Sequence, residues 1–277
     1  MLRDQQAAAR VDVKRARVDG ARFDVLNECR LAAGLVDRVH DDAVFATLEN
    51  LLAADVDDAT NKFVYAPTLG TDQMFQFTFD AKSGHLTANT PATFQMKVMT
   101  GPRHFITSRD NKFVYVLSEL LATVTTLSLD GKTGLLAELG SATGLPADSK
   151  LGPGAPRGAV GGPNAPPRNT DNDIWAADIH MTPNEKFLYI SERTSSTLAA
   201  FSVDAGTGKL AYLGSTPTEK QPRGFAIDPK GRFLVAAGEK SPTISVYAID
   251  QASGALQLLQ KYPAGKGANW VEIVGFD

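Results

Sequence analysis

The sequence predicts an all-β fold, a β-propeller made of four-stranded blades, over residues 51–277. The first observation is a pattern of 26 residues that occurs four times without a gap. The second is that each copy contains short runs rich in β-branched and aromatic residues, which favour strands. The third is the spacing of 50, 74 and 46 residues between successive copies, because about 40 to 50 residues make one propeller blade.

The repeated pattern places Phe, Asp, Gly and Leu at fixed distances. Asp follows Phe by 17 residues, Gly follows Asp by four, and Leu follows two residues later. The Phe residues are Phe63, Phe113, Phe187 and Phe233, and the Asp residues are Asp80, Asp130, Asp204 and Asp250. Each Asp-x-x-(Ser/Thr)-Gly-x-Leu predicts a hairpin turn, with Gly at positive φ and Asp capping backbone amides. One aspartate per repeat does not make a calcium site, which needs six to eight oxygens around one point.

A further strand precedes the Phe of the later repeats. The segments HFITSRD, DIHMTP and GFAIDP lie before Phe113, Phe187 and Phe233. Together with the strands on both sides of the hairpin turn, they give four strands per repeat.

The long interval between the second and third repeats contains an insertion, residues 140–173. It holds six of the fifteen prolines and seven glycines, a composition typical of a long loop. We expect this loop to lie at the rim of the propeller. Its GAPRGAVGGP run neither follows a strand nor opens a helix, which argues against a phosphate-binding loop.

Residues 1–50 differ in composition from the rest of the chain. They contain seven arginines and one lysine, whereas residues 51–277 contain seven arginines and thirteen lysines. The stretch 23–36 is compatible with a helix and has no proline. We expect an unmatched N-terminal extension of one to three short helices, or a sequence foreign to the native protein.

Composition excludes several classes of function. A net charge of -3 gives no general attraction to nucleic acid, and the single cysteine, Cys29, excludes a disulfide framework and a multi-cysteine zinc site. No apolar run reaches the roughly 18 residues of a membrane span. Motifs for a serine nucleophile elbow, a zinc protease, a Walker loop or a dinucleotide are missing. We therefore expect a cytoplasmic protein without a metal, an organic cofactor or a membrane partner, and leave its oligomeric state open.

Four motifs carry a resemblance to a known family. They are GPRHF (101–105), WAADIHMTPNEKFLY (175–189), QPRGFAIDPKGRFLVAAGEKSPTISVY (221–247) and GANWVEIV (267–274). Over about residues 55–277 the chain resembles the lactonase family of seven-bladed propellers, which includes bacterial 6-phosphogluconolactonases and fungal carboxy-cis,cis-muconate cyclases. The resemblance implies catalytic positions at Arg103 and Glu119, and a histidine where this chain has Ala53.

The chain is short for that family. Seven blades of about 45 to 50 residues need about 315 to 350 residues, whereas four repeats are recognisable here. We expect an open arc or a rearranged ring with an exposed sheet edge. In a closed ring, a last strand around Trp270 would complete the first blade.

The candidate site follows from the phase of the repeats, because equivalent positions on the innermost strands converge on the central channel. Arg103, Ala177 and Arg223 lie ten residues before a repeat Phe. The residues that follow them directly are His104, Asp178 and Gly224. His180 shares the strand face of Asp178. The candidate catalytic residues are Arg103, Glu119, Asp178 and His180, and the candidate substrate-binding residues are His104, Arg193 and Arg223.

The chemistry of this set suits an anionic lactone. A guanidinium such as that of Arg103 or Arg223 can bind a phosphate or carboxylate and stabilise an oxyanion. Glu119, or a histidine oriented by Asp178, could activate water. Structural roles stay open for the same residues: the arginines could bind carbonyls between blades, Asp178 and His180 could form a network between blades, and Glu119 could be a rim carboxylate.

The resemblance implies a lactonase acting on a small-molecule sugar lactone, with 6-phosphogluconolactone hydrolysed to 6-phosphogluconate. One alternative is a muconate-lactonising cycloisomerase, which would use the same arginines for carboxylates. The other is a truncated, non-catalytic propeller that acts as a binding module, an alternative motivated by the missing blades and by Ala53.

Overall fold

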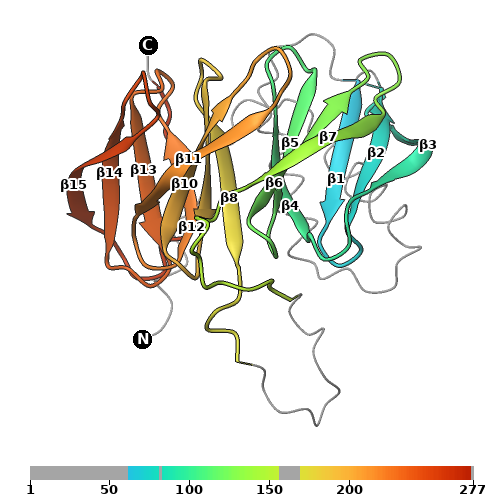
Figure 1. Cartoon of the computed structure of the whole chain (residues 1–277). Coiled ribbons are helices and arrows are strands. Elements are labelled where there is room, and N and C mark those ends of the chain that lie inside the picture. Colours follow the sequence, from blue (N-terminus) through green and yellow to red (C-terminus); the bar gives the residue numbers. More distant parts are fainter. Residues whose placement is uncertain (1–61, 81–82, 156–168, 276–277) are drawn as a thin grey trace, which may run out of the picture.

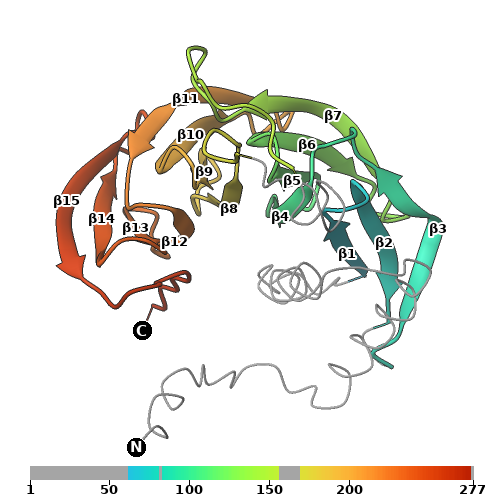
Figure 2. The ribbon, with the colours of Figure 1, turned by 90° about the horizontal axis from the view of Figure 1, so that it is seen from below.

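The structure, a computed structural model, describes residues 62–80, 83–155 and 169–275. In these ranges every regular secondary-structure element is a β-strand, and the strands form four antiparallel sheets (Figure 1). The sheets stand side by side along an arc, with β4, β8 and β12 on its inner side and β7, β11 and β15 on its outer side (Figure 2). The predicted extension, residues 1–50, and Ala53 lie outside the described residues.

In chain order the strands are β1 (Phe63–Thr68), β2 (Gln73–Phe79), β3 (Leu86–Gln95), β4 (Pro102–Thr107), β5 (Phe113–Ser118), β6 (Thr123–Leu129), β7 (Leu136–Thr143), β8 (Ala176–Met181), β9 (Phe187–Glu192), β10 (Thr197–Val203), β11 (Leu210–Pro217), β12 (Pro222–Ile227), β13 (Phe233–Gly238), β14 (Thr243–Ile249) and β15 (Leu256–Pro263). Each sheet contains consecutive strands, paired as β1-β2-β3, β4-β5-β6-β7, β8-β9-β10-β11 and β12-β13-β14-β15. We call these sheets blades 1 to 4. The prediction of four strands per repeat is confirmed for blades 2 to 4, and the described part of blade 1 has three.

The hairpin turns adopt the predicted conformation. The four turn glycines, Gly84, Gly134, Gly208 and Gly254, have φ of 76°, 73°, 70° and 71°. In blade 2, Oδ1 of Asp130 accepts hydrogen bonds from the backbone N–H groups of Lys132 and Thr133 at 2.8 and 3.0 Å. Asp204 and Asp250 cap two backbone N–H groups each in the same way, so capping by the turn aspartate is confirmed for blades 2 to 4.

The recurrence of Phe and Gly in the repeat has a packing explanation. A Cβ atom added to Gly208 of blade 3 would lie 2.6 Å from the ring of Phe113 in blade 2. The pairs Phe63 with Gly134 and Phe187 with Gly254 are related in the same way. The turn of each blade thus lies against the Phe ring of the preceding blade, where only a glycine leaves room.

The hydrophobic core is divided among the interfaces between blades. One cluster joins blades 1 and 2 and includes Tyr65 and Val116, the second joins blades 2 and 3 through residues such as Tyr115 and Ile190, and the third joins blades 3 and 4. Every residue of β5 and β9 is buried, because these strands have a neighbouring blade on each face. The packing of the sheet faces of neighbouring blades against each other holds the inner strands β4, β8 and β12 close together.

Two predicted segments differ in the structure. Strand β7 continues to Thr143, so the insertion predicted at 140–173 begins after this strand. Its described ends meet in a single bridge between Gly152 and Asp173. No strand forms around Trp270, which is 54% exposed. The strand that would complete the first blade of a closed ring is therefore not formed in the described residues, whose four blades stand in an arc (Figure 2).

None of the described residues belongs to a helix of the length and apolarity that crossing a membrane requires.

Candidate active site

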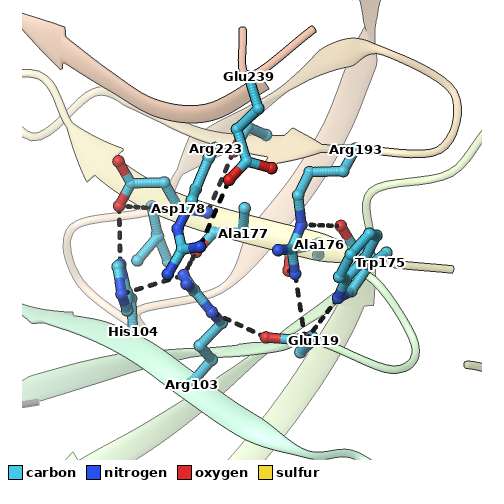
Figure 3. Close-up of polar contacts among 12 residues, drawn as sticks. Arg103, His104, Glu119, Trp175, Ala176, Ala177, Asp178, Arg193, Arg223 and Glu239 are labelled. Carbon is cyan, nitrogen blue, oxygen red and sulfur yellow. Dashed lines mark hydrogen bonds and ion pairs between the residues drawn. The ribbon is translucent and has the colours of Figure 1, made fainter. Parts of the chain in front are cut away.

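A bulge in each inner strand positions the candidate residues. On β4 the pairing register shifts, so that Arg103 and His104 together lie opposite a single residue of β5. Strands β8 and β12 show the same shift at the equivalent positions, which include Asp178 and Arg223. A bulge re-aims the side chains beside it. In all three blades the residues at this point gather in one polar cluster (Figure 3).

Glu119, which directly follows β5, accepts contacts from three side chains (Figure 3). Its Oε2 lies 2.7 Å from Nε of Arg103, and its Oε1 lies 3.1 Å from Nη2 of Arg193. Oε1 also accepts a hydrogen bond of 2.8 Å from the indole Nε1 of Trp175. Both oxygens of this carboxylate are therefore engaged, two of the contacts being charge-assisted, and Glu119 holds the guanidinium groups in place.

Arg193, one residue beyond β9, is enclosed on all sides, with a side chain only 3% exposed. Its Nε and Nη2 donate to the carbonyl oxygens of Trp175 and Ala176, and its guanidinium lies 3.9 Å from the centre of the Trp175 ring. Burial lowers the pKa of Arg193 to about 10, against the opposing effect of Glu119, so the group stays charged at neutral pH. Arg193 therefore clamps Glu119 and Trp175.

Arg103 bridges blades 2 and 3. Its Nη1 donates to the carbonyl oxygen of Ala177 on β8, and its side chain is 12% exposed. Burial lowers the pKa of Arg103, whereas the charges of Glu119 and Asp178 raise it. Among contacts between described residues, none engages its Nη2, which is the donor that remains for a ligand.

Asp178 joins three blades through four hydrogen bonds. Its Oδ1 accepts from Nδ1 of His104 at 2.9 Å and from the backbone N–H of Ile179 at 3.0 Å. Its Oδ2 accepts from Nε2 of His180 at 3.1 Å and from the backbone N–H of Phe225 at 3.2 Å. Burial raises the pKa of the Asp178 carboxyl, but His180 and the bonds from both histidines outweigh this effect and hold that pKa far below its usual range. A buried, ionised carboxylate thus ties β4, β8 and β12 together.

The two histidines bound to Asp178 have opposite protonation behaviour. Nε2 of His104 lies 3.0 Å from Nη1 of Arg103, and a guanidinium only donates, so Nε2 accepts and the proton is on Nδ1. Burial and the charge of Arg103 lower the pKa of His104, which is neutral. For His180, burial lowers the pKa but the charge of Asp178 raises it more, so the net pKa is raised. The His180 side chain is 37% exposed, and it is the histidine that can exchange protons with solvent.

A second Arg–Glu pair lies in blade 4. Nη1 of Arg223 on β12 lies 3.4 Å from Oε1 of Glu239, which directly follows β13. The two side chains are 38% and 25% exposed. This contact is longer and more exposed than that between Arg103 and Glu119. Arg223 is the most accessible of the three guanidinium groups.

The structure brings together all the residues that the sequence names as candidates: Arg103, His104, Glu119, Asp178, His180, Arg193 and Arg223. Their catalytic and binding roles stay predictions. Sequence reasoning missed Glu239, and it did not name Trp175 as a site residue. A second repeat position would have found the missing carboxylate, because the residues six after each Phe are Leu69, Glu119, Arg193 and Glu239.

The described ends of the insertion lie beside this cluster. The backbone N–H of Gly154 donates to the carbonyl oxygen of Leu120 at 2.9 Å, and just after the insertion the backbone N–H of Ala176 donates to the backbone carbonyl oxygen of Glu119 at 3.0 Å. The part of the insertion that the structure describes therefore borders the site, and residues 156–168 of the predicted rim loop lie outside the described residues. In the described part of the chain, no group of three or more His, Cys, Asp or Glu side chains is arranged to hold a metal ion.

Comparisons with known proteins agree on one family, the propeller lactonases. The profile of a family described as "Lactonase, 7-bladed beta-propeller" matches residues 55–273. Two curated 6-phosphogluconolactonases, from Pectobacterium carotovorum subsp. carotovorum (strain PC1) and Serratia proteamaculans (strain 568), are 37% and 36% identical to the chain over 220 residues. The alignments cover 79% and 78% of this chain but 60% and 59% of the relatives. The chain thus spans about 60% of the length of the curated relatives it matches.

Solved structures agree with this result. The periplasmic gluconolactonase of Pseudomonas aeruginosa matches with a TM-score of 0.62 and 28% identity, over 76% of this chain and 54% of that chain. A Bacteroides fragilis NCTC 9343 protein described as a candidate 6-phosphogluconolactonase matches with a TM-score of 0.64 and 28% identity, over 78% and 56% of the two chains. The resemblance carried by the four sequence motifs is confirmed.

Proposed function

Because the chain belongs to the lactonase family of seven-bladed β-propellers, we propose that it hydrolyses a sugar lactone, with 6-phosphogluconolactone as substrate and 6-phosphogluconate as product. The observation that carries the proposal is the gathering of three guanidinium groups, from Arg103, Arg193 and Arg223, at equivalent ends of three neighbouring blades. Guanidinium groups bind phosphate and carboxylate through paired hydrogen bonds; Arg103 and Arg223 are the two that a ligand can reach, because Arg193 is enclosed and holds Glu119 in place. The curated relatives of this chain bear the name of the same activity.

In the proposed reaction, water adds to the carbonyl carbon of the lactone and the ring C–O bond breaks. The carbonyl carbon becomes a carboxylate, the ring oxygen takes one of the two water protons to become a hydroxyl group, and the other proton is released to solvent. Negative charge develops on the carbonyl oxygen as water adds. We assign the stabilisation of this charge to Nη2 of Arg103, because Glu119 and the Ala177 carbonyl fix the rest of that guanidinium. One such preorganised donor accounts for about 10²-fold to 10³-fold in rate.

We assign the activation of water to His180. Its Nε2 donates to Asp178, which leaves the ring Nδ1 as the proton acceptor when the imidazole is neutral. Glu119 is the poorer base, because its two oxygens already accept from two guanidinium groups and an indole N–H. His104 is also unsuited, since its Nε2 accepts from Arg103. Arg223, the exposed guanidinium, is assigned to the anionic group of the substrate.

The test is the hydrolysis of freshly generated 6-phosphogluconolactone by the purified chain. The 6-phosphogluconate formed is measured with 6-phosphogluconate dehydrogenase through NADPH absorbance, and the spontaneous rate is subtracted. The expected result is a saturable rate proportional to protein concentration. A rate equal to spontaneous decay, from protein whose circular dichroism shows folded β-structure, would refute the proposal. Cyclisation of a carboxymuconate by the same protein would favour the cycloisomerase alternative instead.

A further inference from the structure

We infer that Glu239 is a specificity-determining residue: its carboxylate occupies Arg223 in the free protein, and an anionic group of the substrate displaces it. The inference rests on the proposed function, which it deepens by naming what the second Arg–Glu pair selects. An anionic lactone can exchange with Glu239, whereas a neutral lactone makes no such exchange.

The internal repeat supplies the comparison that supports this inference. Arg103 with Glu119 and Arg223 with Glu239 stand at the same two repeat positions, 16 residues apart in each case. The first pair is short, at 2.7 Å, and its side chains are 12% and 13% exposed. The second pair is long, at 3.4 Å, and its side chains are 38% and 25% exposed. The Arg–Glu pair is thus short and largely buried in blade 2, and longer and more exposed in blade 4.

The difference comes from what surrounds each carboxylate. Glu119 accepts from Arg103, Arg193 and the Trp175 indole, so both its oxygens are occupied. Glu239 has one side-chain contact among the described residues, from Arg223 to its Oε1. Removing Glu119 from its partners would strand two largely buried guanidinium groups. Moving Glu239 away exposes an arginine that already reaches solvent, and an anion can replace the contact directly.

Two exposed lysines, Lys220 and Lys240, belong to the segments next to the Arg223–Glu239 pair. The N–H of Glu239 donates to the carbonyl of Gln221 at 3.0 Å, and the N–H of Lys240 donates to that of Lys220 at 3.2 Å. The segments on both sides of the pair therefore each carry an exposed lysine, and with Glu239 displaced Arg223 is the guanidinium that an incoming anion meets.

The energetic order favours displacement by a phosphate group. Exposed single-contact ion pairs contribute little, because water screens them and the side chains lose freedom. A phosphate can accept two parallel hydrogen bonds from one guanidinium and carries more charge than a carboxylate. Glu239 therefore reduces the affinity for every anion at Arg223 and leaves the phosphate as the ligand that best overcomes the competition.

The test is the isosteric substitution Glu239→Gln, which removes the charge and keeps the size. The expected result is a KM for 6-phosphogluconolactone that falls about 3-fold to 10-fold, with kcat unchanged within about 2-fold. The KM for glucono-1,5-lactone, which has no charge, should stay within about 2-fold. The matched control is Glu138→Gln on β7, which removes the carboxylate of an exposed pair with Lys97 outside the polar cluster and should change neither KM.

A binding experiment separates this inference from the proposed function. Titration calorimetry with 6-phosphogluconate and with inorganic phosphate should show tighter binding to Glu239→Gln than to the wild-type chain. In an Arg223→Gln background, Glu239→Gln should no longer tighten binding by more than about 2-fold. If the wild-type chain hydrolyses no lactone but Glu239→Gln still tightens phosphate binding, the proposed function fails, whereas the competition between Glu239 and an anion at Arg223 is supported.

Two results would overturn the inference. One is an unchanged KM for the phosphorylated lactone together with an unchanged affinity for phosphate. The other is a loss of kcat of about 10²-fold or more with an unchanged KM, which would make Glu239 a proton acceptor in the reaction.

Discussion

Replacing Asp178 with Asn tests whether one buried carboxylate joins three blades. The carboxylate accepts four hydrogen bonds, from His104 on β4, from Ile179 and His180 on β8, and from Phe225 on β12. An Asn side chain has nearly the same shape, but one of its oxygens is replaced by an NH₂ group that donates. The substitution therefore turns one end of the side chain from an acceptor into a donor without creating a cavity.

The structure allows the cost to be worked out. The amide oxygen can keep two of the four bonds, and the NH₂ group then faces the other two donors. His180 can respond by changing tautomer, but the backbone N–H of Phe225 cannot, and a buried unsatisfied donor costs about 1–3 kcal/mol. The bonds that remain lose the contribution of the negative charge, so the total is about 3–5 kcal/mol. At about 2–4 °C per kcal/mol for a domain of this size, the Tm should fall by about 6–20 °C.

The assay is thermal unfolding followed by circular dichroism at neutral pH. The matched control is Asp110→Asn, because the Asp110 side chain is 46% exposed and accepts from Ser108 and Lys112 at the surface. This control should change the Tm by less than about 4 °C. A Tm for Asp178→Asn within 2 °C of the wild type would refute the reasoning, since it would mean that the network between blades contributes no stability.

The remaining predictions concern pH, the indole of Trp175 and one turn. For Asp178 the folded pKa is below its usual 3.8, so its stabilisation is present above about pH 4 and should be lost as the pH falls toward the folded value. In urea unfolding at pH 2–7, the free energy of unfolding should therefore fall less on acidification for Asp178→Asn than for the wild type. If neutral His180 activates water, kcat/KM should rise with pH through a raised pKa, and NMR titration should find the same pKa above 6.5; a rise that survives in His180→Asn would contradict this assignment. Trp175→Phe keeps an aromatic ring beneath Arg193 but loses the N–H donated to Glu119, so kcat should fall about 3-fold to 10-fold with a Tm change of less than 5 °C. An unchanged kcat would show that the indole hydrogen bond does not position Glu119. Gly208→Ala should lower stability by about 2–3 kcal/mol in urea unfolding, because the residue has positive φ and no room for Cβ; Gly206→Ala in the same turn should cost less than about 1 kcal/mol, and equal losses would refute the packing explanation.

Much of the fold could be predicted because the repeat is a local signal. The positions of Phe113 and Gly208 follow from blade packing, so their recurrence indicates blades before any strand is assigned. The inner strands were also predictable, since they precede each Phe at a constant distance. Whether a strand forms around Trp270 could not be predicted, because strand pairing depends on a partner strand, which no local pattern near Trp270 reveals.

The candidate site was predicted by position and not by contact. Equivalent repeat positions placed Arg103 and Asp178 in one cluster, and the structure agrees. Which donors each carboxylate accepts depends on bulges and side-chain rotamers, which sequence spacing does not encode. For this reason the sequence left Glu119 open as a base, whereas the structure surrounds it with donors. Glu239 was missed because it lies after the second strand of its blade, at a different repeat position from the inner-strand residues.

The central claim is that the polar cluster catalyses lactone hydrolysis, with the Arg103 guanidinium stabilising the charge that develops on the carbonyl oxygen. The most direct measurement is a ratio of two rates. The rate of 6-phosphogluconolactone hydrolysis by the wild-type chain is divided by that of Arg103→Gln, after subtraction of spontaneous decay, with circular dichroism confirming that both are folded. Arg109→Gln, which alters an exposed arginine on the turn after β4, is the matched control and should give a ratio near one. A ratio of about 10² or more for Arg103→Gln is predicted. A ratio near one, from a wild-type chain that exceeds spontaneous decay, would contradict the account.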